Sequence, residues 1–415
     1  MHKIPKIQDA ELNDKIVLIR VDHNVVKKGE IKDPYRIDAS IETIKYIISK
    51  GGKPVLMSHV GRPRNKKTGE INVSADTSVQ AIVDYLKAKF NLKFKIAYDD
   101  KPDLKRESYL SELKSGNING IYLPNTRWFE GEEAKDGRKQ KFELALSQLA
   151  DVFVNDAFGS WQPHASTVGP TQYLPSYGGL LMQKEISNLK RVISPKNPFL
   201  AVVAGSKFDT KIGPLSALLK NADHVIIGGV IYNAYLCAKY GISIKGINEE
   251  DIRSARKFVE LTEEFPEKLI ELPFIVESKT TESSENRKVH AISELNKGDE
   301  FEYILDAAPQ SFESSKVKFA FQKADTIFVN AVMGLTPTFS DGTISLNKLI
   351  SENDHAQIFY GGGDTLQDFK LLLPELHQKA LNNDSYYFFT GGGTILKAIK
   401  EGSPYELEPV KALLK

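Results

Sequence analysis

Several features are scarce in this sequence, and each scarcity excludes a class of protein. One of its 415 residues is a cysteine, Cys237, so no disulfide can form within the chain, which fits a reducing compartment. No stretch approaches about 18 consecutive apolar residues. The N-terminus also lacks the apolar run of a signal peptide. We therefore expect a cytoplasmic protein that does not enter a membrane.

An excess of charge of one sign is also missing. Lys and Arg number 55 against 54 Asp and Glu, so the net charge gives no attraction to nucleic acid or anionic lipid. The sequence contains no G-x-G-x-x-G, Walker A, H-E-x-x-H or C-x-x-C motif. Its eight histidines are scattered, which argues against a zinc site. Any site for an anionic ligand must therefore be a local cluster.

The length of the chain exceeds what one hydrophobic core supports, so two domains are expected. Strand-like runs alternate with helical ones, which predicts an α/β fold with mainly parallel sheets. The predicted helices are 35–50, 76–90, 142–150 and 178–193, with the domain junction at 194–198. The predicted strands are 15–21, 54–58, 93–97, 120–123 and 152–155, then 199–204, 224–227, 270–276, 302–305, 326–329, 357–360 and 386–389.

Three consecutive glycines, 361–363, follow a predicted buried strand and precede Asp364-Thr365 at the start of a predicted helix. Glycines let the backbone approach a bulky anion, and the free N–H groups of a helix N-terminus favour phosphate. Asp364 adds a carboxylate where a phosphate-bound Mg²⁺ needs oxygen. The alternative is an ordinary strand–helix turn. A second such loop at Gly391–Gly393 favours a phosphate-handling face.

Polar residues cluster after the predicted strands of the first half: Asp22, Asn24, His59, Arg62 and Arg127. Ligands of open α/β sheets bind beyond the carboxyl ends of strands. Two arginines and a histidine there suit a small, doubly anionic substrate, although salt bridges at loop bases are the alternative.

Three further cations stand near predicted helix starts. Arg36 lies where the helix dipole disfavours a cation, which hints at function. Lys207 and Lys211 are four residues apart and are predicted to share one face at the start of a helix. They suit a polyphosphate, or are simply solvated lysines.

Short motifs along nearly the whole chain resemble, in the same order, those of the phosphoglycerate kinase family. The resemblance implies two Rossmann-like, doubly wound domains joined by an interdomain helix. The implied boundaries are 1–180, 181–197 and 198–400, with the tail 401–415 returning to the first domain. The motifs are Val21-Asp22-His23-Asn24-Val25, His59-Val60-Gly61-Arg62-Pro63, Asn125-Thr126-Arg127-Trp128-Phe129, Val154–Gly159, His164–Gly169, Gly205-Ser206-Lys207, Lys211-Ile212, Gly361–Thr365 and Thr390–Gly393.

This resemblance implies reversible phosphoryl transfer between 1,3-bisphosphoglycerate and ADP, giving 3-phosphoglycerate and ATP, with Mg²⁺ as cofactor and a monomeric protein. Arg36 and Lys207 would neutralise the transferring phosphoryl group, and Asp364 would face the metal. The implied substrate-binding residues are Asp22, Asn24, Arg36, His59, Val60, Gly61, Arg62 and Arg127. The implied nucleotide-binding residues are Lys207, Lys211, Asn330, Gly361, Gly362, Gly363, Asp364 and Thr365, with Gly391, Gly392 and Gly393 as a phosphate loop.

The chain also departs from the family pattern. Gln162 stands at the position of a substrate arginine in a loop one residue shorter, and a triple glycine becomes Gly228-Gly229-Val230. A glutamate that contacts ribose is missing from 335–338. We therefore expect a high KM for ATP and poor discrimination against dATP and GTP, unless a rearranged loop supplies another carboxylate. The alternative function is a paralogue with another substrate or a non-catalytic, regulatory role.

Overall fold

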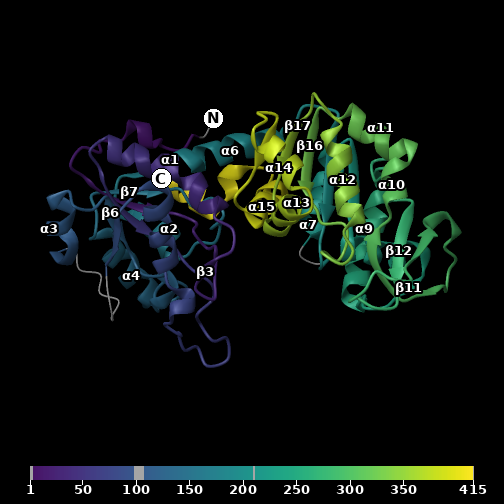
Figure 1. Ribbon diagram of the computed structural model, residues 1–415, viewed down its shortest axis with the longest axis horizontal. Coiled ribbons are helices and arrows are strands. Elements are labelled where there is room, and N and C mark those ends of the chain that lie inside the picture. Colours follow the sequence, from purple (N-terminus) through teal and green to yellow (C-terminus); the bar gives the residue numbers. More distant parts are fainter. Residues whose placement is uncertain (1–2, 98–106, 209–210, 415) are drawn as a thin grey trace. The chain divides into compact units, whose positions relative to one another are not determined.

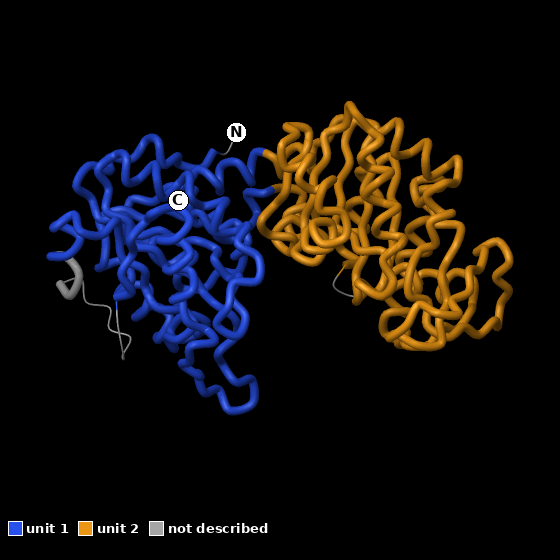
Figure 2. The backbone as a smooth tube through the Cα atoms, in the orientation of Figure 1, with its two compact units in different colours: residues 1–187, 404–415 blue, residues 188–403 orange. Residues whose placement is uncertain are grey.

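The computed structural model describes residues 3–97, 107–208 and 211–414 (Figure 1). The chain forms two compact units (Figure 2). Unit 1 comprises Met1–Ser187 with Pro404–Lys415, and unit 2 comprises Asn188–Ser403.

Both boundaries of the units lie at identifiable elements. The first falls inside the helix α6 (Leu180–Ile193). After the second boundary, the C-terminal helix α16 (Glu408–Leu413) contacts α5 (Ala165–Val168) and the edge strand β8 (Ser176–Gly178). The end of the chain is therefore part of unit 1.

Unit 1 is built on a six-stranded parallel sheet in the order β5-β6-β4-β1-β7-β8. Its strand β1 (Ile16–Arg20) is buried along its whole length, as expected where helices cover both faces of a parallel sheet. Val17 and Ile19 belong to one hydrophobic core and Leu18 to another, because side chains alternate along a strand. The other strands are β4 (Lys53–Met57), β5 (Phe94–Ile96), β6 (Gly120–Tyr122), β7 (Val152–Asn155) and β8.

Helices close both of these cores. The helix α1 (Tyr35–Ser49) presents Ile37, Ile41 and Ile44 at helical spacing to the core that contains Val17. On the opposite face of the sheet, Phe142 of α4 contributes to the core that contains Leu18. The doubly wound arrangement predicted for this half is thereby confirmed. The helices of unit 1 with described bounds are α1, α2 (Gln80–Phe90), α3 (Glu107–Ser115), α4 (Gly137–Ser147), α5 and the first part of α6.

Unit 2 is built on a five-stranded parallel sheet in the order β10-β9-β16-β17-β18. The strand β9 (Phe199–Ala204) is buried throughout and pairs with β10 (His224–Gly228) on one side and β16 (Thr326–Asn330) on the other. The remaining strands are β17 (Gln357–Tyr360) and β18 (Tyr386–Phe388). The helices that follow α6 in this unit are α7 (Ile212–Asn221), α8 (Gly229–Tyr240), α9 (Glu249–Glu264), α10 (Pro309–Glu313), α11 (Ser315–Lys323), α12 (Asp341–Ser351), α13 (Gly363–Leu372), α14 (Pro374–Leu381) and α15 (Gly392–Glu401).

Two of the predicted strands, 270–276 and 302–305, lie outside the parallel sheet. They correspond to β12 (Phe274–Ser278) and β15 (Tyr303–Ala307), which pair antiparallel in a sheet ordered β13-β12-β15. A polar, exposed loop joins β12 directly to β13 (Lys288–Ala291), and such a short connection permits only antiparallel pairing. Two further pairs of short strands are β2 (Val26–Lys27) with β3 (Glu30–Ile31), and β11 (Ser243–Ile244) with β14 (Glu300–Phe301).

Four predicted helix starts are wrong. The helix predicted at 76–90 begins at Gln80, after a separate 3-10 turn, and that predicted at 142–150 begins at Gly137, because Asp136 caps it there. Gly178 belongs to β8 and α6 begins at Leu180, because Gly178 pairs with Asn155 of β7 and its N–H donates to the carbonyl of Pro5 over 2.8 Å. The helix α7 begins at Ile212, so Lys207 precedes it and does not share a helix face with Lys211. Between them Phe208 is fully buried, and its N–H donates to Asp251 over 2.7 Å, which holds this segment outside the helix.

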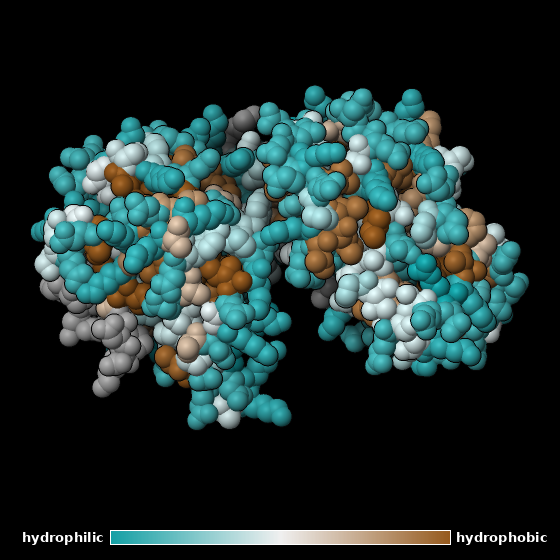
Figure 3. All heavy atoms as spheres, viewed as in Figure 1, coloured by the Kyte–Doolittle hydropathy of each residue, from teal (hydrophilic) through white to brown (hydrophobic). Residues whose placement is uncertain are grey.

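The surface seen in Figure 3 is mostly hydrophilic on each unit, with apolar side chains showing in smaller areas. Among the described helices, none combines the length and apolar character needed to span a membrane. Cys237 is buried in α8 as a free thiol, and burial raises the pKa of this thiol to about 11.

Candidate active site

Each main sheet has one place where the order of its strands reverses. In unit 1 the chain passes from β1 to β4 on one side and later adds β7 on the other; in unit 2 it passes from β9 to β10 and later adds β16. Ligands of such sheets bind beyond the carboxyl ends of the strands at this point. Most of the predicted site residues follow β1, β4 and β6 in unit 1, and β9 and β17 in unit 2. Arg36 lies instead in the first turn of α1, Asn330 ends β16, and Gly391–Gly393 follow β18.

A buried arginine organises the site of unit 1. The last residue of β1, Arg20, is completely buried, and its guanidinium donates to Ser166 Oγ over 2.9 Å and to the carbonyl of Val21. The nearby carboxylate of Glu132 is 1% exposed and accepts from Ser166 Oγ over 2.6 Å and from Ser166 N over 2.9 Å. Burial lowers the pKa of Arg20, whereas the charges of Glu132 and Asp22 oppose that shift.

The tautomer of His59 follows from its contact with Arg20. A guanidinium nitrogen of Arg20 lies 2.9 Å from His59 Nδ1, and since arginine has no acceptor, Nδ1 must accept. The ring proton of His59 then resides on Nε2. Burial, reinforced by the charge of Arg20, holds the pKa of His59 well below its usual value. His59 is therefore a neutral group with one N–H to donate.

The other predicted residues of unit 1 gather around this pair. Arg36 forms an ion pair with the buried Asp22, with 3.2 Å between Nη1 and Oδ2. Arg127 donates to the carbonyl of Gly61 over 2.6 Å, and Asn24 Oδ1 accepts from Gly61 N over 2.8 Å.

The loop after β4 carries two more of the predicted residues, Val60 and Arg62. Val60 is buried, and its N–H donates to Asn125 Oδ1 over 3.0 Å, which fixes the loop after β4. The next side chain in that loop, Arg62, is exposed to solvent. Gln162, at the position of the missing arginine, is exposed too. The loop after β4 thus presents Arg62 to solvent beside the anchored cations.

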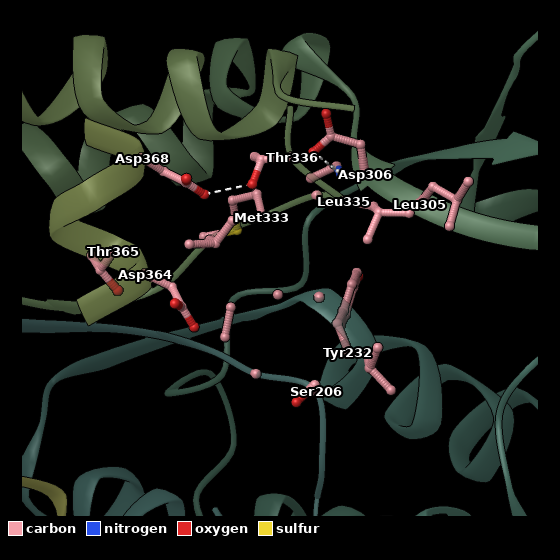
Figure 4. A pocket seen from close by; sticks show the side chains of 18 of the residues that line it. Ser206, Tyr232, Leu305, Asp306, Met333, Leu335, Thr336, Asp364, Thr365 and Asp368 are labelled. Atoms are coloured by element: carbon pink, nitrogen blue, oxygen red, sulfur yellow. Dashed lines mark hydrogen bonds between the residues drawn. The ribbon is translucent and has the colours of Figure 1, made fainter. Parts of the chain in front are cut away.

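Unit 2 contains a cavity of about 720 Å³ at the carboxyl ends of β9, β10, β16 and β17 (Figure 4). One part of its wall carries the charged and glycine residues Lys207, Lys211, Asn330, Gly362, Gly363 and Asp364. Another part is apolar and includes Tyr232, Ile304, Leu305 and Met333. A cavity with one ionic and one apolar wall suits an anion attached to a flat apolar group.

The glycine loop approaches the backbone and side chains around it very closely. Gly362 has φ of 118°, and a Cβ on it would lie 2.6 Å from Asn330 Nδ2, so this position requires glycine. A Cβ on Gly392, from the second glycine loop, would lie 2.5 Å from Gly362 Cα. Gly361 and Gly391–Gly393 are not among the residues that line the cavity. The second loop therefore supports the first from behind.

Lys211 is held in this wall by Asn330, to whose Oδ1 its Nζ donates. The Asn330 amide also donates to the carbonyl of Gly361, so it joins the lysine to the glycine loop. Burial lowers the pKa of Lys211 to about 8, although the charge of Asp364 opposes the shift. Burial therefore disfavours the charged form of Lys211, and a bound anion would favour it.

Comparisons with known proteins agree with this arrangement. The family model described as Phosphoglycerate kinase matches residues 7–402. Phosphoglycerate kinases of Dictyoglomus turgidum and Finegoldia magna are 31% and 33% identical over 407 residues, which is 95% of this chain and of theirs.

Two solved structures have the same fold. The phosphoglycerate kinase from Coxiella burnetii is 28% identical, with a TM-score of 0.76 over 99% of both chains. That from Pyrococcus horikoshii, 23% identical, has a TM-score of 0.77 over 99% of this chain and 98% of its own.

The chain belongs to the phosphoglycerate kinase family. The predicted activity is thereby confirmed: this is a phosphotransferase with a carboxyl group as acceptor, which exchanges a phosphoryl group between 1,3-bisphosphoglycerate and ADP.

Four residues of these two candidate sites were not predicted from the sequence. Arg20 reads as part of an apolar strand, and Glu132 as one member of an ordinary charged loop. Asp306 lines the cavity and accepts from Gly342 N over 3.0 Å, and burial raises the pKa of its carboxyl to about 7. Asp368 also lines the cavity, one helical turn after Asp364. For Asp368 the sequence did contain one signal, because it stands four residues after Asp364, a predicted nucleotide-binding residue.

Proposed function

We propose that unit 1 binds 3-phosphoglycerate and 1,3-bisphosphoglycerate, and that the cavity of unit 2 binds ADP or ATP with Mg²⁺. The observation that carries the proposal is the meeting of Lys211, Asp364 and the glycine loop at the N-terminus of α13. Unpaired N–H groups and the helix dipole favour phosphate at such a terminus. Thr365 and Asn330 flank the loop and complete this set.

On the substrate side, the guanidinium groups of Arg36, Arg62 and Arg127 would bind the phosphate and carboxylate of the glycerate. The His59 Nε2–H would donate to one of these anions. Asp22 would keep Arg36 in place through their ion pair. Asn24 would hold the loop at Gly61 through the bond that it accepts from Gly61 N. Val60, whose N–H is already bonded to Asn125, would shape this loop rather than bind substrate through its backbone.

The residues present fit Mg²⁺ bound together with a nucleotide. Mg²⁺ usually takes one or two carboxylates and completes its shell with phosphate oxygens and water, and Asp364 on the cavity wall offers one carboxylate. Within the described residues, no group of three or more His, Cys, Asp or Glu side chains forms a metal site by itself. The nucleotide must therefore supply ligands. When bound, the ion would neutralise charge on the β- and γ-phosphates.

In the direction that consumes ATP, a carboxylate oxygen of 3-phosphoglycerate forms a bond to the γ-phosphorus while the bond to the ADP oxygen breaks. The transferring group carries negative charge on its equatorial oxygens, so the protein must position and neutralise it. We assign this role to Arg36 and Lys207. Neither residue becomes covalently modified, and the acyl phosphate returns the phosphoryl group to ADP by the reverse step.

A coupled assay with 3-phosphoglycerate and Mg-ATP tests the proposed function. Turnover that depends on both substrates supports it, and Asp364→Asn should weaken Mg-ADP binding with little effect on 3-phosphoglycerate binding. A folded protein that binds both ligands by calorimetry without turnover would instead support the non-catalytic paralogue.

We also propose that the protein acts in the cytoplasm, because its one cysteine, Cys237, is a buried free thiol. We further propose that it is a monomer, in which one chain carries both the substrate site and the nucleotide site.

A further inference from the structure

The helix α13 carries a second acidic residue on the wall of the nucleotide cavity. Asp368 is 8% exposed, and its Oδ2 accepts from Thr336 Oγ1 over 2.6 Å (Figure 4). Within residues 3–97, 107–208 and 211–414, this is the one hydrogen bond of the Asp368 carboxylate. The other carboxylate oxygen, Oδ1, is therefore available in the cavity that Asp368 lines.

The position of Asp368 along α13 matches the order of groups in a nucleotide. Asp364 and Asp368 are four residues apart, so they share a face of the helix and are separated by about 6 Å along its axis. The phosphates are assigned to the N-terminal end, at Gly362, Gly363 and Asp364. The sugar is the next group of a nucleotide after its phosphates. One helical turn further along α13, the cavity wall therefore faces the sugar with a carboxylate.

A ribose suits this carboxylate better than the other parts of the nucleotide do. The 2′- and 3′-hydroxyls are neutral donors, and an acidic residue that accepts from ribose hydroxyls is a recurring feature of α/β nucleotide sites. A phosphate would be repelled, and the base has the apolar wall of Tyr232 and Leu305 available. A nearly buried carboxylate with one unused oxygen also needs a donor to offset its desolvation.

We infer that Asp368, held by Thr336, binds the ribose hydroxyls of the nucleotide and makes the enzyme selective for ribonucleotides. The inference rests on the proposed placement of the phosphates at α13. It replaces the expectation of poor discrimination against dATP, because the acceptor missing from 335–338 is supplied by the neighbouring helix. Thr336, which belongs to that segment, orients the carboxylate instead of binding the sugar itself.

The inference is tested by kcat/KM for ATP, 2′-deoxyATP, 3′-deoxyATP and GTP at saturating 3-phosphoglycerate. The wild type should prefer ATP over at least one deoxy analogue by roughly ten- to a hundredfold, the range of a hydrogen bond to a charged group. Asp368→Asn should bring that ratio to within about threefold, mainly through KM, since sugar binding is shared by ground and transition states. The matched control Glu375→Gln removes an exposed carboxylate from α14 and should leave the ratio unchanged.

A positioning role for Thr336 has its own signature. Thr336→Val should reduce the preference for ribose, and Thr336→Ser, which keeps the hydroxyl, should restore it. If Asp368 merely fastened this loop to α13, Asp368→Asn would lower the melting temperature without changing the ratio of ATP to deoxyATP. That result would overturn the inference.

Direct binding separates this inference from the proposed function. Calorimetry with ADP and 2′- and 3′-deoxyADP measures sugar selectivity without turnover, so an inactive protein whose selectivity depends on Asp368 would refute catalysis alone. A wild type that binds all three within about twofold would overturn the inference. A variant that changes only the ratio of ATP to GTP would also overturn it, because Asp368 would then read the base.

Discussion

The two candidate sites are both proposed to bind a multiply charged anion, but they are built from different groups. In unit 1, charged side chains hold one another in place: Asp22 pairs with Arg36, and Glu132 lies beside the buried Arg20. In unit 2, the backbone of Gly362 and Gly363 lines the cavity, and one glycine loop packs directly on another. In unit 1, carboxylates next to Arg20 and Arg36 orient these cations before substrate binds. In unit 2, the cavity is lined by glycine backbone together with Lys207 and Lys211.

This difference predicts where substitutions will act. A substitution in the unit 1 network leaves a buried charge without its partner, so it should affect folding as well as binding. In unit 2, Lys211 donates to the neutral side chain of Asn330, and the carboxylate of Asp364 is exposed, so a substitution of Lys211 leaves no buried charge without its partner. Its effect should be confined to nucleotide binding and catalysis. The following experiments test that contrast, from the largest expected effect to the smallest.

The largest effect should come from the two proposed catalytic cations, one from each unit. Arg36→Ala and Lys207→Ala should each lower kcat by roughly a hundred- to a thousandfold or more, with smaller changes in KM, because they act on charge that develops in the transition state. Steady-state kinetics measures this. Lys220→Ala, at an exposed position near the end of α7, is the control and should retain normal kcat. Near-normal kcat in Lys207→Ala would refute its role.

The next effect concerns folding of unit 1. Glu132→Ala removes a carboxylate that accepts three hydrogen bonds and opposes the charge of Arg20, so the free energy of unfolding should fall by about 3–5 kcal/mol. Both tryptophans, Trp128 and Trp161, belong to unit 1, so urea unfolding followed by their fluorescence reports on this unit.

The control for this prediction is Glu130→Gln, in the same loop. Glu130 is exposed and its ion pair with Arg138 spans 3.5 Å, so the variant should unfold like the wild type. An unfolding free energy of Glu132→Ala within about 1 kcal/mol of the wild type would show that the buried network does not hold unit 1 together.

The contrast between the units also explains how far the sequence could predict the site. Apolar runs and helical spacing located most strands and the core face of α1, because the alternation of apolar and polar residues along a short segment shows which side is buried. The strand–glycine–helix pattern at Gly361–Gly363 is also local, and its recurrence at Gly391–Gly393 favoured a phosphate-handling loop over an ordinary turn. Arg62 and Arg127 could be predicted because they follow strands, and Arg36 because it lies at a helix start, whereas Arg20 could not be predicted.

Residues that act through distant partners could not be predicted in this way. Glu132 and Ser166 are 34 positions apart, and their bond depends on how the sheet brings two loops together. Asp368 reads as a surface residue of a helix until Thr336 is placed opposite it. Lys207 was misplaced because the burial of Phe208, which delays the start of α7, comes from tertiary packing.

A smaller effect should follow from restoring an arginine to unit 1. Gln162→Arg adds a cation to the substrate side, and a charge-assisted bond to phosphate is worth about 1.5–3 kcal/mol, or roughly ten- to a hundredfold in affinity for 3-phosphoglycerate. Calorimetric titration measures this, and Gln172→Arg adds the same charge at another exposed position as a control. Equal affinity in wild type and Gln162→Arg would mean that the existing cations already saturate the substrate.

The smallest effect is a pH dependence that should distinguish the two half-sites. Burial brings the pKa of Lys211 down to about 8, and a bound phosphate favours the protonated lysine. Below that pKa the lysine is already charged and Mg-ADP affinity should be flat. Above it, binding requires uptake of a proton, so affinity should fall as pH rises, by at most about tenfold per unit. Unit 1 is proposed to bind its substrate through guanidinium groups rather than a lysine, so 3-phosphoglycerate affinity should not follow the same curve.

Titrations with each ligand between about pH 7.5 and 9.5 make this comparison within one protein. Calorimetry in buffers of different ionisation enthalpy counts the protons taken up, which should approach one per Mg-ADP at the upper end and zero for 3-phosphoglycerate. Lys211→Arg is the matched variant, because a guanidinium does not titrate here and should abolish the pH dependence of Mg-ADP binding. A fall of equal size for both ligands would contradict the assignment, since it would arise from a change common to the two units rather than from Lys211.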